Sequence, residues 1–290
     1  MILGGIEAGG TKFVCAVGNE FGEVLERVQF DTSTPEQTMP HIINFFKDKK
    51  VEAIGIGCFG PIDPNLESPT YGYVTTTPKV GWHNFDFIGE MKKHFSVPLG
   101  FDTDVNVACL GEATYGAARG LSSAIYLTIG TGIGGGVLAE GKLLHGLLHP
   151  EMGHMYVRRH PNDTYEGKCP YHKDCFEGLA AGPAIEARWL KKGVELADVE
   201  EVWEMEAFYI AEALSTYILT LSPERIILGG GVMKQRQLFP LIHQNVLSRL
   251  NGYIQKDEIL KNIESYIVPP ALEDNAGVVG ALALAKAVSE

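Results

Sequence analysis

Residues 4–12 spell Gly4-Gly5-Ile6-Glu7-Ala8-Gly9-Gly10-Thr11-Lys12, a strand-like segment that runs into a glycine-rich turn. Glycines at the point where a strand reverses let backbone N–H groups approach a phosphate with no side chain in the way. Thr11 and Lys12 add a hydroxyl and a cation. An ordinary tight hairpin is the alternative for this turn taken alone. A Walker loop is excluded, because its G-x-x-x-x-G-K-[ST] spacing is absent and the turn leads into a strand instead of a helix.

The residues around this turn alternate between strand-like and helix-like segments. We expect strands over residues 2–6, 13–18, 24–30, 53–58 and 98–101. We expect one helix from residue 35, with Thr34 as its cap, Pro35 in the first helical position and Gln37 completing a capping box. A second helix is expected over residues 85–95. The order βββαβαβ is typical of an α/β domain.

The same pattern starts again near residue 123. We expect strands over residues 124–129, 137–139, 225–228 and 266–268, and helices over residues 201–221, 234–250 and 278–288. Ile6-Glu7-Ala8-Gly9 and Ile129-Gly130-Thr131-Gly132 occupy equivalent places, which indicates a weak internal duplication. The chain is therefore expected to form two similar α/β domains that face each other across a cleft, where small ligands preferentially bind.

Glycine clusters follow a strand at three places in the chain. The first is the turn at residues 9–10, the second is residues 130–136 with five glycines and one threonine, and the third is Gly229-Gly230-Gly231. One such cluster is weak evidence for a ligand. Three clusters distributed over both halves are better explained by a shared nucleotide than by three coincidental turns.

Composition limits the possible partners of the chain. Its 290 residues are 45% hydrophobic and 21% charged, which suits a globular protein of two domains, and its net charge of −12 argues against binding nucleic acid or an anionic membrane. That charge does not exclude ATP, which is held at contact range. No apolar stretch reaches the roughly 20 residues that span a bilayer, and the first residues lack a signal-peptide pattern. We therefore expect a cytoplasmic protein with reduced thiols.

Together these motifs resemble the ROK sugar kinases, within the actin and hexokinase-like ATPase superfamily. The resemblance rests on the order of the glycine clusters, Asp104-Val105-Asn106, Glu151-Met152-Gly153-His154 and residues 169–177, and it extends over nearly the whole chain. The spellings of residues 5–12 and of Cys169-Pro170-Tyr171-His172 are most similar to the fructokinase branch. The resemblance implies two ribonuclease-H-like (actin/hexokinase-type) α/β domains flanking an active-site cleft. These would be residues 1–107, completed by a helix over 276–290, and residues 108–275.

The resemblance also implies a nucleotide site. The residues that contact the phosphates of ATP would be Gly9, Gly10, Thr11, Lys12, Thr131 and Gly132. The adenosine would be bound by Pro183, Gly230, Gly231, Val232, Met233, Lys234 and Gln235. Glu7 stands where family members commonly have Asp, whose carboxylate helps to hold the water shell of Mg²⁺. The longer side chain of Glu can do the same, with a different metal geometry.

Asp104 follows an expected strand and precedes an expected helix, so it would lie at the mouth of the cleft. From the sequence alone, helix capping is the more common role of such an Asp. Phosphoryl transfer from ATP needs a carboxylate that orients the acceptor hydroxyl and receives its proton. By resemblance, Asp104 is that catalytic base. Asp102 does not match the family motif and is interpreted as structural.

A hexose offers hydroxyl groups, which carboxylates, amides and imidazoles bind through paired hydrogen bonds. By resemblance, the sugar-binding set is Gly60, Pro61, Asn106, Glu151, His154 and Glu177. Any single Glu or His is more often a solvated surface group, so the prediction depends on their order and spacing.

Cysteine and histidine also form a separate cluster. Cys169, His172 and Cys175 have C-x₂-H-x₂-C spacing, and His154 lies fifteen residues upstream. Two thiolates and two imidazoles complete a tetrahedral set for a structural Zn²⁺. Two free thiols and two loop histidines are the alternative. Family members usually show C-x-C-G-x-x-G-C here, so His172 would replace a thiolate with no loss of ligand count. Residues 155–175 contain few apolar side chains, so we expect this loop to depend on the metal for its order.

The resulting hypothesis is an ATP- and Mg²⁺-dependent hexose kinase that converts fructose to fructose 6-phosphate. Thr103 stands where many glucokinases of the family have Asn, which argues against glucose. A kinase for mannose, glucose or an N-acetylhexosamine remains an alternative, as does a sugar-sensing ROK regulator. A regulator would carry an added N-terminal DNA-binding domain, for which we expect no room here. An ATP-driven structural or chaperone protein would not explain the sugar carboxylates. The family implies a homodimer.

Overall fold

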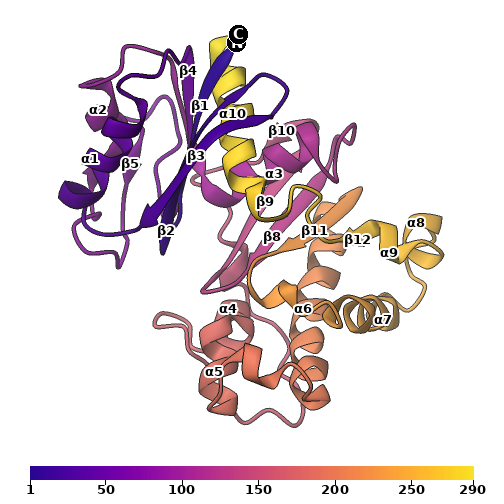
Figure 1. Cartoon of the computed structure of the whole chain (residues 1–290). Coiled ribbons are helices and arrows are strands. Elements are labelled where there is room, and N and C mark those ends of the chain that lie inside the picture. The colour runs from indigo at the N-terminus through magenta and orange to yellow at the C-terminus, as the bar shows by residue number, and fades with distance from the viewer.

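A computed structural model describes residues 1–290, and two five-stranded sheets form its frame (Figure 1). The first sheet has the order β3-β2-β1-β4-β7. Its strands are β1 (Ile2–Ala8), β2 (Lys12–Asn19), β3 (Val24–Asp31), β4 (Ala53–Cys58) and β7 (Leu99–Thr103). The first three strands form an antiparallel meander, while β4 and β7 run parallel to β1. The meander and the buried strand over 53–58 are thus confirmed.

The second sheet repeats this plan in the order β10-β9-β8-β11-β12. Its strands are β8 (Ala124–Ile129), β9 (Ile133–Ala139), β10 (Lys142–Leu143), β11 (Arg225–Gly229) and β12 (Ile267–Val268). Again an antiparallel meander is followed by two parallel strands. The shared strand order confirms the internal duplication that the sequence indicated. A small third sheet pairs β5 (Tyr73–Val74) with β6 (Phe85–Asp86).

Helices cover both faces of the first sheet. Neighbouring residues of a strand point to opposite faces, and here Gly4 of β1 faces Phe46 of α1 (Pro35–Phe46) whereas Gly5 faces Val278 of α10 (Ala276–Ser289). The helix α2 (Phe87–Lys92) contributes Phe87 and Met91 to the same apolar core as Phe46. The helix α10 thus returns from the far end of the chain to lie on the first sheet (Figure 1).

The helix α3 (Asp104–Tyr115) lies between the two sheets. It packs against α10 on one side and against β8 and β9 on the other. The opposite side of the second sheet carries the larger apolar core, which includes the long helix α6 (Glu200–Leu221) and α7 (Leu238–Leu250). The remaining helical segments are α4 (Phe176–Ala180), α5 (Gly182–Trp189), α8 (Asp257–Leu260), α9 (Ile263–Tyr266) and four short 3₁₀ turns, η1 (Met152–His154), η2 (Gly193–Leu196), η3 (Val232–Lys234) and η4 (Glu273–Asn275). No helix combines the length and the apolar character needed to cross a membrane.

Several expected boundaries are wrong. The segment over 85–95 is a two-residue strand followed by a helix that ends at Lys92. The helix expected from Lys234 starts at Leu238, because Gln235 leaves helical geometry and ends a 3₁₀ turn instead. The glycine turn expected over 130–136 is shorter, since β9 begins at Ile133.

The capping box expected at the start of α1 is also absent. Thr34 is the N-cap residue, but its side chain makes no capping hydrogen bond, whereas the Thr38 hydroxyl accepts from the backbone N–H of Ser33 at 3.1 Å. The side chain of Gln37 bonds the Ser33 hydroxyl. Ser33, one residue before the expected cap, therefore stabilises the start of α1 through its hydrogen bonds to Thr38 and Gln37.

We predict that Gly55→Ala destabilises the fold. A methyl group on Gly55 of β4 would lie 2.0 Å from the carbonyl oxygen of Ala281 in α10, and backbone cannot move aside as a side chain can. Overpacking of this kind costs about 1–3 kcal/mol or more in the free energy of unfolding. Gly146→Ala is the matched control, because its nearest neighbour is 4.0 Å away. Urea unfolding of both variants tests the prediction, and equal midpoints would contradict it.

Candidate active site

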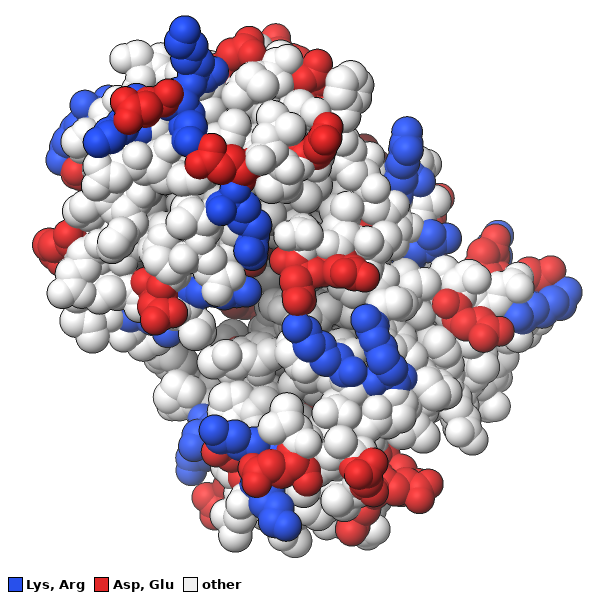
Figure 2. All heavy atoms as spheres, in the orientation of Figure 1, with Lys and Arg blue, Asp and Glu red and all other residues white.

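Two cavities meet at the first residue of α3. A cavity of about 350 Å³ is lined by Glu7 of β1 and Thr128 of β8, and one of about 820 Å³ is lined by Glu151 on the loop before η1. Asp104 and Val105 line both. Figure 2 shows the molecule hollowed between its upper and lower parts, with acidic and basic side chains near the rim. A group bound in one cavity could therefore react with a group bound in the other beside the Asp104 carboxylate.

Asp104 is not the cap of its helix. The N-cap of α3 is Thr103, whose side chain accepts a hydrogen bond from the backbone N–H of Asn106 at 3.1 Å. The capping interpretation of Asp104 is thus wrong, and its carboxylate accepts from backbone N–H groups at the start of α3, that of Val105 at 2.9 Å. Burial raises the pKa of Asp104 to about 6, although these backbone hydrogen bonds act in the opposite direction. A carboxylate with a raised pKa accepts a proton more readily near neutral pH.

Glu7 faces the smaller cavity next to Asp104. Its Oε2 atom is buried and has no hydrogen-bond partner, and the carboxylate lies so close to Gly277 of α10 that a methyl group there would be 2.5 Å away. Burial, followed by repulsion from Asp104, raises the pKa of Glu7 to about 7, while Lys12 opposes this. An orphaned carboxylate oxygen beside a second carboxylate is chemistry that suits a hard divalent cation.

Most of the expected nucleotide-binding residues lie around two adjoining cavities. Lys12, Gly230, Gly231 and Lys234 line the 350 Å³ cavity. Thr131, Pro183, Gly231, Val232 and Gln235 line a cavity of about 460 Å³, together with Ile185 and Trp203. Gly9, Gly10, Thr11 and Gly132 belong to the turns beside these cavities without lining them, and Met233 borders a third cavity of about 280 Å³. The second and third glycine clusters therefore border adjoining cavities, and the first turn reaches them through Glu7 and Lys12.

The larger cavity brings together five of the six expected sugar-binding residues, namely Gly60, Pro61, Glu151, His154 and Glu177. Glu177 also accepts a hydrogen bond from the backbone N–H of Ile133 at 2.9 Å, so its carboxylate links this cavity to the second glycine turn. Partial burial, together with repulsion from Glu177 and Asp104, raises the pKa of Glu151. The three carboxylates are thus within electrostatic reach of one another.

Asn106 lies behind the cavity wall and is fully buried. Its side-chain amide donates to Asp102 Oδ1 at 2.8 Å, and Asp102 Oδ2 lies 2.8 Å from Nε2 of His145. That hydrogen bond raises the pKa of His145. Asp102 also accepts from the N–H of Thr103, which fixes the backbone just before Asp104. This geometry agrees with the structural interpretation of Asp102.

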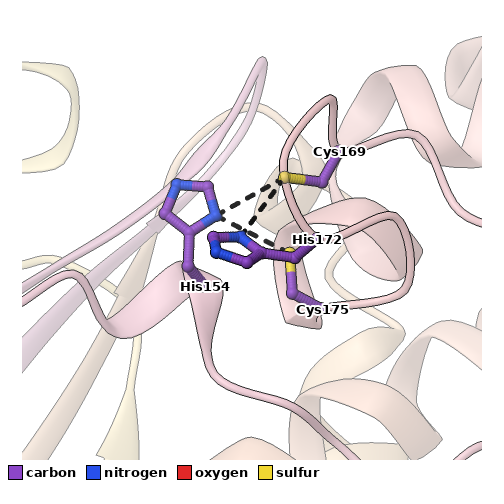
Figure 3. Close-up of side chains that lie close together, drawn as sticks. All are labelled: His154, Cys169, His172 and Cys175. Carbon is purple, nitrogen blue, oxygen red and sulfur yellow. Dashed lines mark hydrogen bonds between the residues drawn. The ribbon is translucent and has the colours of Figure 1, made fainter. Parts of the chain in front are cut away.

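His154, Cys169, His172 and Cys175 converge on one point (Figure 3). The Sγ atoms of Cys169 and Cys175 lie 3.7 and 3.6 Å from Nδ1 of His154, and Cys169 Sγ lies 3.7 Å from Nδ1 of His172. With Zn–S near 2.3 Å and Zn–N near 2.1 Å, a tetrahedron has S···N edges of about 3.6 Å. The four residues therefore have the chemistry and the spacing of a zinc site.

The loop that carries these cysteines has a second anchor, which the sequence analysis missed. Asp163 is buried and pairs with Arg188 of α5 through two hydrogen bonds of 3.0 and 3.2 Å, and the hydroxyl of Tyr209 in α6 donates to it at 2.5 Å. Removing one partner of such a buried pair leaves an uncompensated charge and is strongly destabilising. The part of the loop near Asp163 therefore has an anchor of its own, which the expected dependence of residues 155–175 on a metal did not include.

Lys79 is another residue that the sequence analysis missed. It lies on the loop whose Thr76 and Pro78 line the larger cavity, and its Nζ atom would be 3.6 Å from a methyl group placed on Gly10. A second cation therefore lies beside the first glycine turn, in addition to Lys12. Its distance in sequence from Gly10 leaves no local signal that could have revealed it.

The chain belongs to the ROK family, whose model matches residues 3–288. A protein of Bacillus subtilis (strain 168) is 56% identical over 98% of this chain and 95% of its own length. A fructokinase of Pediococcus pentosaceus is 48% identical over 99% of this chain and 98% of its own. Among solved structures, a ROK hexokinase from Thermus thermophilus is 25% identical with a TM-score of 0.80, over 99% of this chain and 98% of that one. The predicted family and fold class are confirmed.

Proposed function

We propose that this protein is an ATP-dependent fructokinase that produces fructose 6-phosphate and ADP. One observation carries the proposal: the Asp104 carboxylate borders both the cavity reached by the glycine turns and the cavity lined by Glu151, His154 and Glu177. A kinase needs this arrangement, because acceptor and donor must meet at one base. Curated relatives named fructokinase, 43–48% identical over at least 94% of the chain, support the sugar assignment.

In the proposed reaction, Asp104 accepts the proton of the sugar 6-hydroxyl as its oxygen bonds to the γ-phosphorus. The bond between that phosphorus and the oxygen bridging to ADP breaks, and the electron pair leaves with ADP. Glu151 and Glu177 hold other hydroxyls of the sugar, so that the 6-hydroxyl stays in line with the phosphate. Lys12 and Lys79 place positive charge near the transferred group.

Glu7 would hold Mg²⁺ through its water shell, since its unpartnered Oε2 faces the nucleotide cavity beside Asp104. When bound, the ion neutralises the charge that builds up on the phosphates.

We also propose that residues 1–107 and 276–290 form one domain and residues 108–275 the other, which fits the packing of α10 on the first sheet.

We predict that Asp104→Asn lowers kcat by roughly 10² to 10⁴, the usual contribution of a positioned general base. Sugar binding should remain, because Asn keeps the shape of the side chain. The melting temperature should not fall, since the change removes a half-buried charge. Steady-state kinetics and thermal unfolding test this prediction. A near-normal kcat would show that Asp104 is not the general base.

The pH dependence follows from the same group. With a pKa of about 6, Asp104 is ionised and able to accept a proton above that pH, and protonated below it. We therefore expect kcat/KM to fall at least about tenfold for each pH unit below about 6, because Glu7 and Glu151, whose pKa values burial also raises, become protonated in the same range. A profile that stays flat down to pH 5, with protein shown to be folded there, would contradict the assignment.

We expect fructose to be the preferred acceptor and the reaction to require a divalent cation. A coupled ADP-release assay across fructose, mannose, glucose and N-acetylglucosamine, with and without Mg²⁺, tests the order of kcat/KM values. Phosphorus NMR of the product identifies the hydroxyl that is modified. Efficient use of glucose or an aminosugar with no activity on fructose would overturn the sugar assignment while leaving the kinase assignment in place.

We predict one zinc per chain, held by His154, Cys169, His172 and Cys175. His154 uses Nδ1 toward the metal, which leaves Nε2 able to donate to a sugar hydroxyl. Cys169→Ser should lose the zinc and raise the KM for sugar more than the KM for ATP, because residues 167–177 carry Glu177. Asp174→Asn, in the same loop but outside the cluster, is the control. Metal analysis that finds no zinc in protein purified without chelator would contradict the prediction.

A further inference from the structure

His149 is a buried imidazole on an otherwise exposed loop. Its side chain is 4% exposed and lines the sugar cavity, while the two leucines before it, Leu147 and Leu148, are 98% and 49% exposed. Burial of an imidazole in preference to neighbouring leucines opposes the hydrophobic effect. The polar partners of His149 must therefore account for its place.

The first partner lies on the opposite wall of the cavity. The backbone N–H of Ile62, just after Gly60-Pro61, donates to Nε2 of His149 at 3.2 Å. An acceptor nitrogen carries no proton, so the neutral ring has its proton on Nδ1. Burial lowers the pKa of His149, although the neighbouring backbone of Pro150 acts in the opposite direction, and this favours the neutral form. The ring also packs on Gly60, where a methyl group would lie 3.2 Å from Cε1.

The second partner is the carboxylate of Glu151. Its Oε1 atom lies 3.6 Å from Nδ1 of His149, the nitrogen that carries the proton. This separation is slightly too long for a hydrogen bond, but such contacts often shorten when the substrate binds. A movement of a few tenths of an ångström would let Nδ1–H donate to Oε1 and leave Oε2 for a sugar hydroxyl.

We propose that His149 is a positioning residue, which holds the segment Gly60–Ile62 through Nε2 and orients Glu151 through Nδ1–H. The two walls of the sugar cavity come from opposite halves of the chain, and one imidazole then fixes the distance between them. The inference rests on the proposed role of Glu151 in sugar binding. It assigns to His149 no contact with the reacting atoms.

Two conservative variants separate the two contacts. In His149→Asn, the amide NH₂ lies near the position of Nδ1 and can still donate to Glu151, but nothing reaches Ile62. In His149→Gln, the longer side chain can accept from the N–H of Ile62, but no donor faces Glu151. We expect His149→Ala to raise the KM for sugar about 10- to 100-fold and to change the KM for ATP less than about twofold. His149→Asn should recover more of the sugar affinity than His149→Gln.

A double-mutant cycle with Glu151→Ala tests the coupling, because Ala has no group that accepts from Nδ1–H. If His149 acts partly through Glu151, His149→Ala should raise the sugar KM at least about threefold less in the Glu151→Ala background than in the parent protein, and the lost contact with Ile62 accounts for the effect that remains. Multiplicative effects would overturn the proposal, as would an unchanged sugar KM in His149→Ala. Leu147→Ala, on the same loop, is the control and should match the parent protein.

The measurements also separate this inference from the proposed function. Absence of hexose phosphorylation by the parent protein would defeat the proposed function itself. An active parent whose His149 variants keep its sugar KM would defeat only the positioning role. Should His149→Ala fail to fold, the comparison of His149→Asn with His149→Gln still decides, because equal sugar KM values would show that orientation of Glu151 does not matter.

Discussion

The backbone of α10 lies directly against glycines of neighbouring elements, and the geometry of the site depends on this contact. Gly55 of β4 faces the carbonyl of Ala281, Gly111 of α3 faces that of Ala276, and Gly280 of α10 approaches the carbonyl of Val107 in α3. Side chains at these positions would push α3 away from the first sheet. Because Asp104 is the first residue of α3, the same displacement would move the carboxylate out of the line between the two cavities.

The site combines two lysines with four carboxylates, and each kind of charge has its own place. A net charge of −12 would repel ATP at long range, but Lys12 and Lys79 lie beside the first glycine turn and act at short range. The acidic groups are sorted in a similar way. Glu7 lines the smaller cavity, Glu151 and Glu177 line the larger one, and Asp104 lines both.

The sequence predicts those features of the fold that depend on local pattern. The continuous apolar runs at Ala53–Cys58 and Ala124–Ile129 are strands with the expected bounds. A glycine does not mark a turn, however, where close packing requires it. Gly136 lies within strand β9, and a methyl group on it would be 2.2 Å from the carbonyl of Val105. Local pattern does not reveal such a contact, because the two residues are far apart in sequence.

The same limit applies to the site. Asp104 and Glu151 were found because their order resembles a family, and the Cys/His cluster because of its metal-ligand spacing. His149 and Lys79 have partners distant in sequence and match no motif. From the sequence alone, capping was a plausible role for Asp104, although Thr103 is the cap, since both residue types are good caps and no local rule separates adjacent candidates.

The place of α10 also has a consequence for synthesis on the ribosome. Strands β1 and β4 are made early, but the helix that covers their glycine-rich face spans residues 276–289. At about 5–20 residues synthesised per second, on the order of ten seconds or more passes between the synthesis of β4 and that of α10. In that interval the second half of the chain is synthesised without interruption, so its own hydrophobic core can form first. The half that carries the first glycine turn would therefore be the last to become fully ordered.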